Sequence, residues 1–432
     1  MNNNHSELRK SLRNETMYQV FVRNYSKAGT LNALKADLPR IKDLGVSILY
    51  LLPIHPIGKV ARKGKVGSPY SIKDYRAIDK AQGTMEEFQT LINEAHNLDL
   101  KVFMDIVFNH TSRDSKMLKM HPDWFFYRNG KLANRVGDWS DIGDLDFTNM
   151  KMRKYLIDTL IKYVNMGVDG FRCDVAPLVP LDFWLDAVQA VNKINPSVIW
   201  YSESIEMSFL KYMRGEGHHA HADAEMYQAF DILYNYDAFP LYTGYFEGKN
   251  TLEQYLHGVN LMEVIYPEDY LKTHCLENHD QQRAHHTIKN ELSLRNFTAW
   301  SFFVPGVSFL YAGQEVKATK RPDLFEKDPI DLTITDQAFY NLIKKLIAIK
   351  KDKVFKEKTY FNASKAQEGD VIIAELRSLD ETYLGIFNLS EGVISISLPY
   401  DVNELHDSIS DQTLIVNNGS IEVKEPIIAK IR

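Results

Sequence analysis

The sequence predicts an α/β fold: a (β/α)₈ TIM barrel with a small domain inserted after its third strand and an antiparallel β-sandwich at its C-terminal end. Short apolar runs alternate with amphipathic helical patterns from about residue 17 to residue 349. A polar interval at residues 109–147 is too long for an ordinary βα loop. From about residue 351 the helical pattern gives way to short alternating runs.

The predicted barrel elements follow one another as strand and helix. Strands are expected at residues 17–25, 47–53, 101–108, 168–175, 198–202, 272–276 and 307–312, and helices at 31–44, 85–98, 152–164, 181–194, 294–304 and 338–349. Thr84 is the expected N-cap of the second helix. Strands separated by helices imply parallel βαβ units with right-handed crossovers, and about eight such units suit a closed barrel.

These patterns divide the chain into three parts. We expect the barrel to comprise residues 1–108 and 148–350, the inserted domain residues 109–147, and the sandwich residues 351–432. Alternating runs at 371–376, 383–387 and 393–398, with Gly, Asn and Asp turns between them, predict antiparallel strands in the last part.

The composition indicates a globular protein without a nucleic-acid partner. Hydrophobic residues make up 44% of the chain and charged residues 25%, and the formal charge is −6. Cys173 and Cys275 lie in separate apolar runs, so we expect no disulfide. Residues 1–16 contain no apolar stretch of the kind found in signal peptides, and the most apolar run, residues 47–54, is too short to span a bilayer. We therefore expect a cytoplasmic protein without a membrane partner.

Ionisable residues gather where four predicted strands end. The segments are Asp105-Ile-Val-Phe-Asn-His110, Gly170-Phe-Arg-Cys-Asp174, Glu203, and Glu277-Asn-His-Asp280. The carboxyl ends of barrel strands meet at one rim, where barrel enzymes carry out catalysis. These segments are therefore the candidate active site.

Strand alternation and local environment suggest roles for the carboxylates. Arg172 and Asp174 share one face of their strand, and the adjacent guanidinium should keep Asp174 ionised. The apolar run before Glu203 should favour its neutral acid form. Two carboxyl groups whose pKa values are pushed apart are typical of the nucleophile and the acid in glycoside cleavage. Asp280 could hold the positive charge that develops on the sugar, and His110 could hydrogen-bond sugar hydroxyls.

Taken in order, the four segments resemble the sequence motifs of the α-amylase family of glycosidases, and Gly143-Asp-Leu-Asp146 resembles a fifth motif. The resemblance covers nearly the whole chain and implies a barrel, a domain B after strand three and a C-terminal sandwich. It further implies a set of roles for individual residues. Asp174 would be the nucleophile, Glu203 the acid/base, Asp280 the transition-state stabiliser, Arg172 the residue that orients the nucleophile, and His110, His279 and Tyr70 sugar-binding residues.

The implied activity is retaining hydrolysis of α-1,4 bonds in starch-derived oligosaccharides (maltodextrins). Many family members carry Lys-His shortly after the nucleophile, where this chain has Pro177-Leu178, so the acceptor side of its site differs. Transglycosylation and α-1,6 cleavage on the same scaffold therefore stay open. A non-catalytic binding subunit and a metal-dependent hydrolase using the histidines near residue 219 are more remote alternatives.

No cofactor is implied for the chemistry, but the family resemblance raises a structural calcium ion. Asn109 and Asp144 match two of the family's calcium ligands, and the carbonyl of Leu178 could supply a third. Calcium takes six or more oxygen ligands, and the sequence shows only these. The alternative is a hydrogen bond between Asn109 and Asp144 that fastens domain B to the barrel.

Several other residues have competing interpretations. Asp105 either takes part in the chemistry or anchors a loop, and Glu206 competes with Glu203 for the acid role. Tyr70 is either a sugar platform or a packing residue. We interpret the remaining candidates as structural: His218, His219 and His221 as a solvated loop, Trp124, Trp139 and Trp184 as packing, and Cys173 as a small apolar filler.

Overall fold

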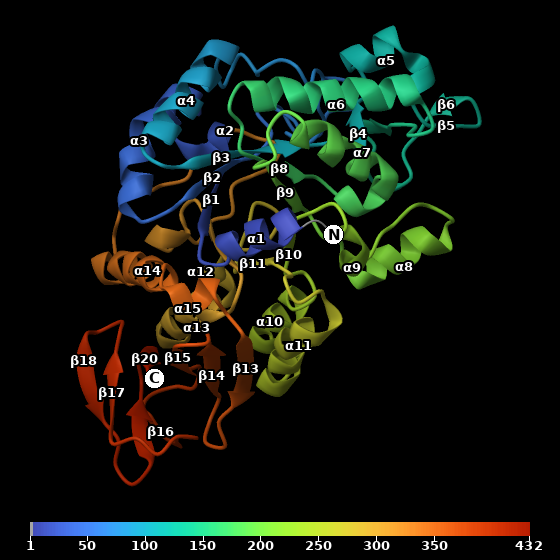
Figure 1. Ribbon diagram of the computed structural model, residues 1–432. Helices are drawn as coiled ribbons and strands as arrows, with labels where there is room; N and C mark the ends of the chain where they lie inside the picture. The colour runs from blue at the N-terminus through green and yellow to red at the C-terminus, as the bar shows by residue number, and fades with distance from the viewer. Residues whose placement is uncertain (1–2) are drawn as a thin grey trace. The chain divides into compact units, whose positions relative to one another are not determined.

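The computed structural model describes residues 3–432 (Figure 1). Residues 1 and 2, which the sequence assigns to the barrel, lie outside the described residues. Eight strands form a closed barrel and follow one another around it in chain order. They are β1 (Thr16–Val20), β2 (Ile48–Leu51), β3 (Lys101–Ile106), β8 (Gly170–Cys173), β9 (Ile199–Ser202), β10 (Ile232–Tyr234), β11 (Lys272–His274) and β12 (Val307–Tyr311). The predicted barrel is confirmed.

The six predicted helices lie close to their expected positions, and a further long helix, α11 (Leu252–Ile265), was not predicted. The six are α3 (Leu31–Asp43), α4 (Met85–Asn97), α6 (Met150–Asn165), α7 (Leu181–Asn192), α13 (Glu291–Phe303) and α14 (Gln337–Lys350). Thr84 caps α4 as predicted: its hydroxyl accepts the N–H of Glu87, whose carboxylate accepts the N–H of Thr84.

Shorter helices occupy the connections. They are α1 (Asn3–Leu12), α2 (Val22–Tyr25), α8 (Met207–Gly215), α9 (Asp223–Met226), α10 (Phe239–Phe246), α12 (Ala284–Thr287) and α15 (Lys353–Lys356), with 3₁₀ turns η2 (Ala176–Leu178) and η3 (Gln314–Val316). Among residues 3–432, no helix has both the length and the apolar character needed to cross a membrane.

The first predicted strand is wrong in its second half, where β1 ends at Val20 and α2 begins at Val22. The buried polar side chains of Arg23 and Asn24 explain the turn. Arg23 donates hydrogen bonds to the carbonyls of Gly67 and Leu324, and the Asn24 amide donates to the carbonyl of Asp323. A continued strand could not point two consecutive side chains to the same group of loops.

Strand β10 was not predicted. It contains only three residues, Ile232–Tyr234, and its apolar run is too short to show a period. It pairs in parallel with β9, with Ile232 opposite Tyr201.

The inserted segment after β3 folds on short strands. It contains β4 (His110–Ser112), α5 (Lys116–Met120), η1 (Pro122–Trp124), β5 (Tyr127–Arg128), β6 (Lys131–Leu132) and β7 (Ile142–Asp144). Strand β4 leaves the end of β3 and pairs antiparallel with β7, with His110 directly opposite Asp144. We call this segment, residues 109–147, domain B.

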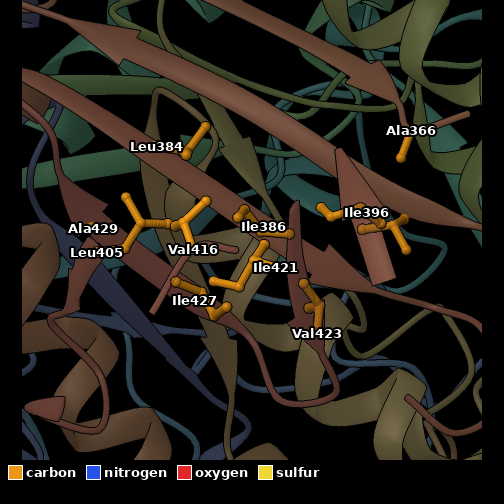
Figure 2. Packing of buried hydrophobic residues seen from close by; sticks show 11 residues of the cluster. Ala366, Leu384, Ile386, Ile396, Leu405, Val416, Ile421, Val423, Ile427 and Ala429 are labelled. Carbon is orange, nitrogen blue, oxygen red and sulfur yellow. The ribbon is translucent and has the colours of Figure 1, made fainter. Parts of the chain in front are cut away.

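The C-terminal part forms two antiparallel layers, as predicted. One sheet has the order β13-β14-β15-β20-β17-β18 and the other pairs β16 with β19. Their bounds are β13 (Tyr360–Lys365), β14 (Val371–Arg377), β15 (Thr382–Asn388), β16 (Ile394–Ser397), β17 (Glu404–Asp407), β18 (Gln412–Ile415), β19 (Ser420–Val423) and β20 (Ile427–Lys430). Figure 2 shows the shared apolar core, in which Ile396, Ile421 and Val423 of the small layer pack with Leu384 and Ile386 of the large one.

By compactness the chain separates into two units that differ from the three expected parts. One unit takes residues 18–234 and 322–331, and the other takes residues 235–321 and 332–432 with the segment before Tyr18. The division into barrel, domain B and sandwich therefore stays a proposal based on the element order.

Candidate active site

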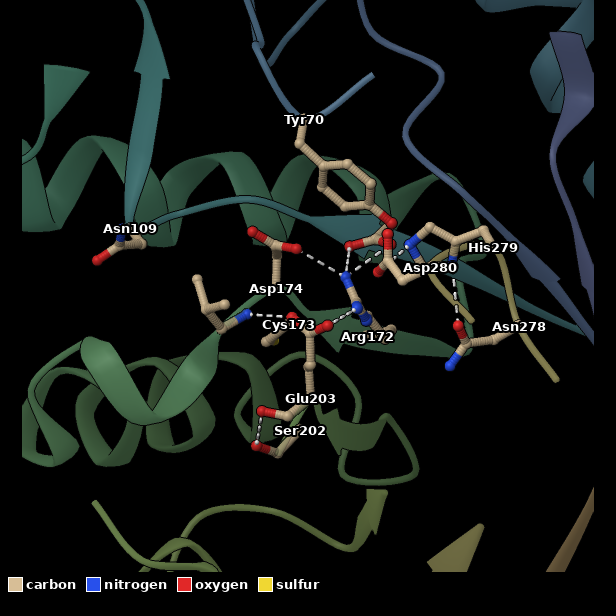
Figure 3. A network of polar contacts seen from close by, with 12 residues as sticks. Tyr70, Asn109, Arg172, Cys173, Asp174, Ser202, Glu203, Asn278, His279 and Asp280 are labelled. Atoms are coloured by element: carbon tan, nitrogen blue, oxygen red, sulfur yellow. Dashed lines mark hydrogen bonds and ion pairs between the residues drawn. The ribbon is translucent and has the colours of Figure 1, made fainter. Parts of the chain in front are cut away.

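The guanidinium of Arg172 is the centre of the candidate site in the first unit (Figure 3). Its Nη1 lies 3.0 Å from each carboxylate oxygen of Asp105 and 2.9 Å from Oδ1 of Asp174. Its Nη2 forms an ion pair with Oε1 of Glu203 at 2.7 Å. One buried cation therefore holds three carboxylates that come from three different strand ends.

The parallel register explains why these side chains converge. Asp105 of β3 lies beside Arg172 of β8, which in turn lies beside Tyr201 of β9. The ladder continues one residue past the strands: the N–H of Asp174 donates to the Ile106 carbonyl, and the N–H of Glu203 donates to the Cys173 carbonyl. The shared face of Arg172 and Asp174, predicted from strand alternation, follows from this geometry.

The charges in this cluster stabilise one another. Burial alone lowers the pKa of Arg172, but the negative charges of Asp105 and Glu203 outweigh burial and raise that pKa well above its ordinary value. Arg172 and Asp105 are completely buried, whereas Asp174 is 7% exposed and Glu203 is 8% exposed. A ligand can therefore reach the carboxylates of Asp174 and Glu203, but not that of Asp105.

Tyrosines complete the surroundings of Asp105. Its Oδ2 accepts hydrogen bonds from the hydroxyls of Tyr50 at 2.7 Å and Tyr70 at 3.1 Å, in addition to its contact with Arg172. Because Oδ2 of Asp105 already has three partners, the structure supports an anchoring role for Asp105 rather than a part in the reaction. The rings of Tyr70 and Tyr234 each lie 5.7 Å from the Arg172 guanidinium carbon, within the range of cation–π attraction.

Sequence reasoning missed Tyr50 and Tyr234 as parts of the site. Tyr50 was read as part of an apolar strand, although a hydroxyl within an aliphatic run needs a buried partner and could have been noticed. Tyr234 belongs to β10, the strand that was not predicted, and it stacks on Tyr201 with ring centroids 4.7 Å apart.

The expectation of an apolar environment for Glu203 is wrong. Its Oε1 contacts Arg172, and its Oε2 accepts the N–H of Val175 at 2.7 Å. Both contacts stabilise the carboxylate. Val175 points this N–H at Glu203 from a left-handed conformation with φ of 36°, which a β-branched residue rarely adopts. The competing acid Glu206 is exposed and lies at the N-cap of α8.

His110 is buried at the start of domain B and is close to Trp139, with ring centroids 5.4 Å apart. Burial lowers the pKa of His110 to about 4, although a hydrogen bond with the backbone of Tyr70 acts in the opposite direction. The imidazole is therefore neutral at physiological pH and can both donate and accept hydrogen bonds.

In the second unit, the segment after β11 holds His279 and Asp280. The Asn278 side-chain oxygen accepts the N–H groups of Asp280 and Gln281, which forms a tight turn. His279 Nε2 lies 3.0 Å from Oδ2 of Asp280, and Arg321 Nη1 donates to the Asp280 carbonyl at 2.6 Å. The backbone of Asp280 is thus held by Asn278 and Arg321, and its side chain is held by His279.

A buried ion pair closes the base of this turn. Glu277 receives a hydrogen bond from Arg283 at 2.5 Å on one oxygen and from the N–H of Ala284 at 2.5 Å on the other. Arg283 also donates to the carbonyls of Ala312 and Lys320. The ends of β11 and β12 are therefore joined by one guanidinium, a connection that the sequence motifs did not indicate.

The residues present do not fit the calcium site that the resemblance implies. The side-chain nitrogen of Asn109 lies 3.1 Å from His110 Nδ1, and Asp144 Oδ2 accepts two hydrogen bonds from Arg135. The alternative to a metal ion, a hydrogen bond between the side chains of Asn109 and Asp144, is not formed either. Across residues 3–432, no group of three or more His, Cys, Asp or Glu side chains is placed to hold a metal ion, and this includes the histidines at 218–221.

The segment that follows Val175 is apolar. Pro177 and Leu178, which stand where many family members have Lys-His, form the turn η2. Leu178 packs with Met213 and Ala220, and Val175 and Phe209 lie against the same cluster.

Comparison with known proteins decides the family. The sequence model described as "Alpha amylase, catalytic domain" matches residues 10–370, which is well over half of the chain. The chain belongs to the α-amylase family. It is an α-amylase-type glycoside hydrolase.

Three relatives show the range of this family. The α-amylase of Lactobacillus plantarum, a solved structure, has 39% sequence identity and a TM-score of 0.94, with 99% of this chain and 100% of that one covered. A maltogenic α-amylase of Thermotoga neapolitana has 32% identity and a TM-score of 0.85, with 97% and 99% covered. The alpha-1,4-glucan:maltose-1-phosphate maltosyltransferase of Burkholderia pseudomallei is 31% identical over 230 residues, which cover 47% of this chain but only 20% of that protein.

The lowered pKa of His110 gives a pH prediction for this α-amylase family member. The unfolded imidazole has a pKa of about 6.5, so the contribution of His110 to stability is fully present above about pH 6.5 and is lost as the pH falls toward 4. We predict that the His110 resonances do not titrate between roughly pH 5 and pH 8. Imidazole NMR spectra, with His110→Gln to assign the signal, measure this. A His110 midpoint near the ordinary value would contradict its burial.

Proposed function

We propose that this α-amylase family member hydrolyses α-1,4 bonds in maltodextrins with retention, through a covalent glycosyl-enzyme intermediate. The observation that carries the proposal is that one guanidinium holds both accessible carboxylates, Asp174 and Glu203. Because Arg172 contacts both, the two groups are close enough to act on the same glycosidic bond.

In the first step, Asp174 acts as the nucleophile. Arg172 fixes Oδ1 of Asp174, and the carboxylate attacks the anomeric carbon of the bound sugar. The bond between that carbon and the glycosidic oxygen breaks as the ester bond to Asp174 forms. Glu203 delivers a proton to the departing oxygen, so the leaving chain departs as a neutral alcohol.

In the second step, the roles of Glu203 reverse. It takes a proton from water, the water oxygen bonds to the anomeric carbon, and the ester bond to Asp174 breaks. Two inversions at one carbon retain the α-configuration. Both oxygens of Glu203 are engaged in the free protein, so its acid form requires that Arg172 or the Val175 N–H releases one of them.

Asp280 is assigned to the transition state. It follows strand β11, and the residues that follow barrel strands are where barrel enzymes carry out catalysis. The tight turn and the Arg321 contact hold its backbone, while His279 orients its carboxylate. A fixed negative charge of this kind stabilises an oxocarbenium-like sugar without reorganising during the reaction.

The sugar-binding groups of the proposal are Tyr70, His110 and His279. The Tyr70 ring is half-buried and fixed through its hydroxyl, so we assign its accessible part to stacking on a sugar. The neutral imidazole of His110 can form hydrogen bonds with hydroxyl groups of the bound sugar. The names of relatives, an α-amylase and a maltogenic α-amylase, support starch-derived oligosaccharides as the substrate class.

Removing the nucleophile tests the mechanism. We predict that Asp174→Asn lowers kcat by at least roughly 10⁴-fold while the protein stays folded, because an amide cannot form the ester. Exposed Glu206→Gln, near the site but outside the network, is the matched control and should keep its activity. Time-resolved NMR of the wild-type products should show the α-anomer first; a β-anomer would overturn double displacement.

Transfer to a second sugar is the alternative that a comparison favours, since one relative is a maltosyltransferase. On this chain we expect water to be the main acceptor. Incubation with maltoheptaose should give only shorter chains on chromatography. Products longer than the substrate would assign the protein to the transglycosidases, and a panel with pullulan and isomaltose would report α-1,6 cleavage.

A further inference from the structure

Arg135 of domain B lies where the family resemblance expects a metal ion. Its backbone N–H donates to Oδ2 of Asp144 at 2.8 Å, and its Nη1 donates to the same oxygen at 3.2 Å. Nη1 also donates to the carbonyl of Leu145 at 3.3 Å. A single residue thus makes three contacts with the segment Asp144–Leu145.

The position of Arg135 is well defined by its neighbours. Its guanidinium carbon lies 4.4 Å from the centre of the Phe126 ring. The β5–β6 hairpin that precedes Arg135 is held at both ends, since the N–H of Phe126 donates to the Asp144 carbonyl and the N–H of Asp144 donates to the Ala133 carbonyl. The cation is therefore held in place rather than free to leave.

Asp144 is at the junction between domain B and the barrel. It is buried and lies opposite His110 in the β4–β7 ladder, and the N–H of Leu145 donates to the carbonyl of Asn109, which lies between β3 and β4. A buried carboxylate at such a junction needs a positive partner. In the described part of the chain, the ion pair of Asp144 is with Arg135.

A calcium ion is a poor second partner in this arrangement. It requires six or more oxygens, yet Oδ2 of Asp144 and the Leu145 carbonyl already accept hydrogen bonds from Arg135. An ion bound to the remaining oxygen, Oδ1, would also lie next to the guanidinium and be repelled by it.

We propose that Arg135 supplies the positive charge at the junction of domain B and the barrel, so that this protein holds domain B without a structural calcium ion. The side chain does the work of an internal counter-ion. It neutralises Asp144 and joins the segment after the β5–β6 hairpin to β7.

Thermal unfolding with and without metal tests this proposal independently of the catalytic mechanism. The wild-type Tm should be the same after dialysis against EDTA and in millimolar CaCl₂. Arg135→Gln should lower Tm by several degrees, because it leaves a buried carboxylate unpaired. Calcium should then raise the Tm of that variant, because Oδ1 of Asp144 and the Leu145 carbonyl no longer lie beside a guanidinium, while Oδ2 keeps the N–H of residue 135.

Two variants make the test specific. Arg128→Gln is the matched control: Arg128 is an exposed domain B arginine, 5.9 Å from the Phe126 ring, and its loss should leave Tm unchanged. Arg135→Lys keeps the charge and should lower Tm less than Arg135→Gln, which keeps the test usable if the glutamine variant does not fold. A wild-type Tm that falls in EDTA or rises with calcium would overturn the proposal, as would an Arg135→Gln protein with wild-type Tm or with no response to calcium.

Discussion

A buried guanidinium that contacts three carboxylates is the interaction on which the candidate site depends. An arginine stays charged at any accessible pH, and removing that charge from water is costly unless carboxylates surround it. Arg172 meets this requirement only if the ends of β3, β8 and β9 stay in register, because each strand end contributes one of its partners. The electrostatics of the site and the architecture of this part of the barrel therefore depend on each other.

Arginine side chains also hold several partners at two other places in the chain. In the second unit Arg283 joins the ends of β11 and β12 through Glu277 and two carbonyls, and it closes the turn that carries Asp280. In domain B, Arg135 joins the segment after the β5–β6 hairpin to Asp144. Planar guanidinium groups suit this role, because they can donate several hydrogen bonds in fixed directions to carbonyls and carboxylates at once. The loops that bear the proposed catalytic and sugar-binding residues are thus fixed by internal cations.

Much of this arrangement could be predicted from the sequence, because it follows from periodicity. The side-chain period of a strand is two, so the shared face of Arg172 and Asp174 could be predicted without coordinates, and so could the meeting of strand ends. The predictions that were wrong concern features that arise from contacts between distant segments. The turn at Arg23 is caused by partners about 44 and 301 residues away, and the polar environment of Glu203 comes from a neighbouring strand. No local pattern marks Arg135 as the partner of Asp144.

We propose that Asp174, held by Arg172, is the one carboxylate that forms an ester with the anomeric carbon. This proposal is tested most directly by trapping the intermediate with a fluorinated α-glucosyl fluoride whose glycosyl-enzyme ester hydrolyses slowly, followed by proteolysis and mass spectrometry. We predict one added sugar on the peptide that contains Asp174. A sugar on the peptide of Asp105 or Glu203, or turnover of the reagent with no covalent adduct, would contradict it.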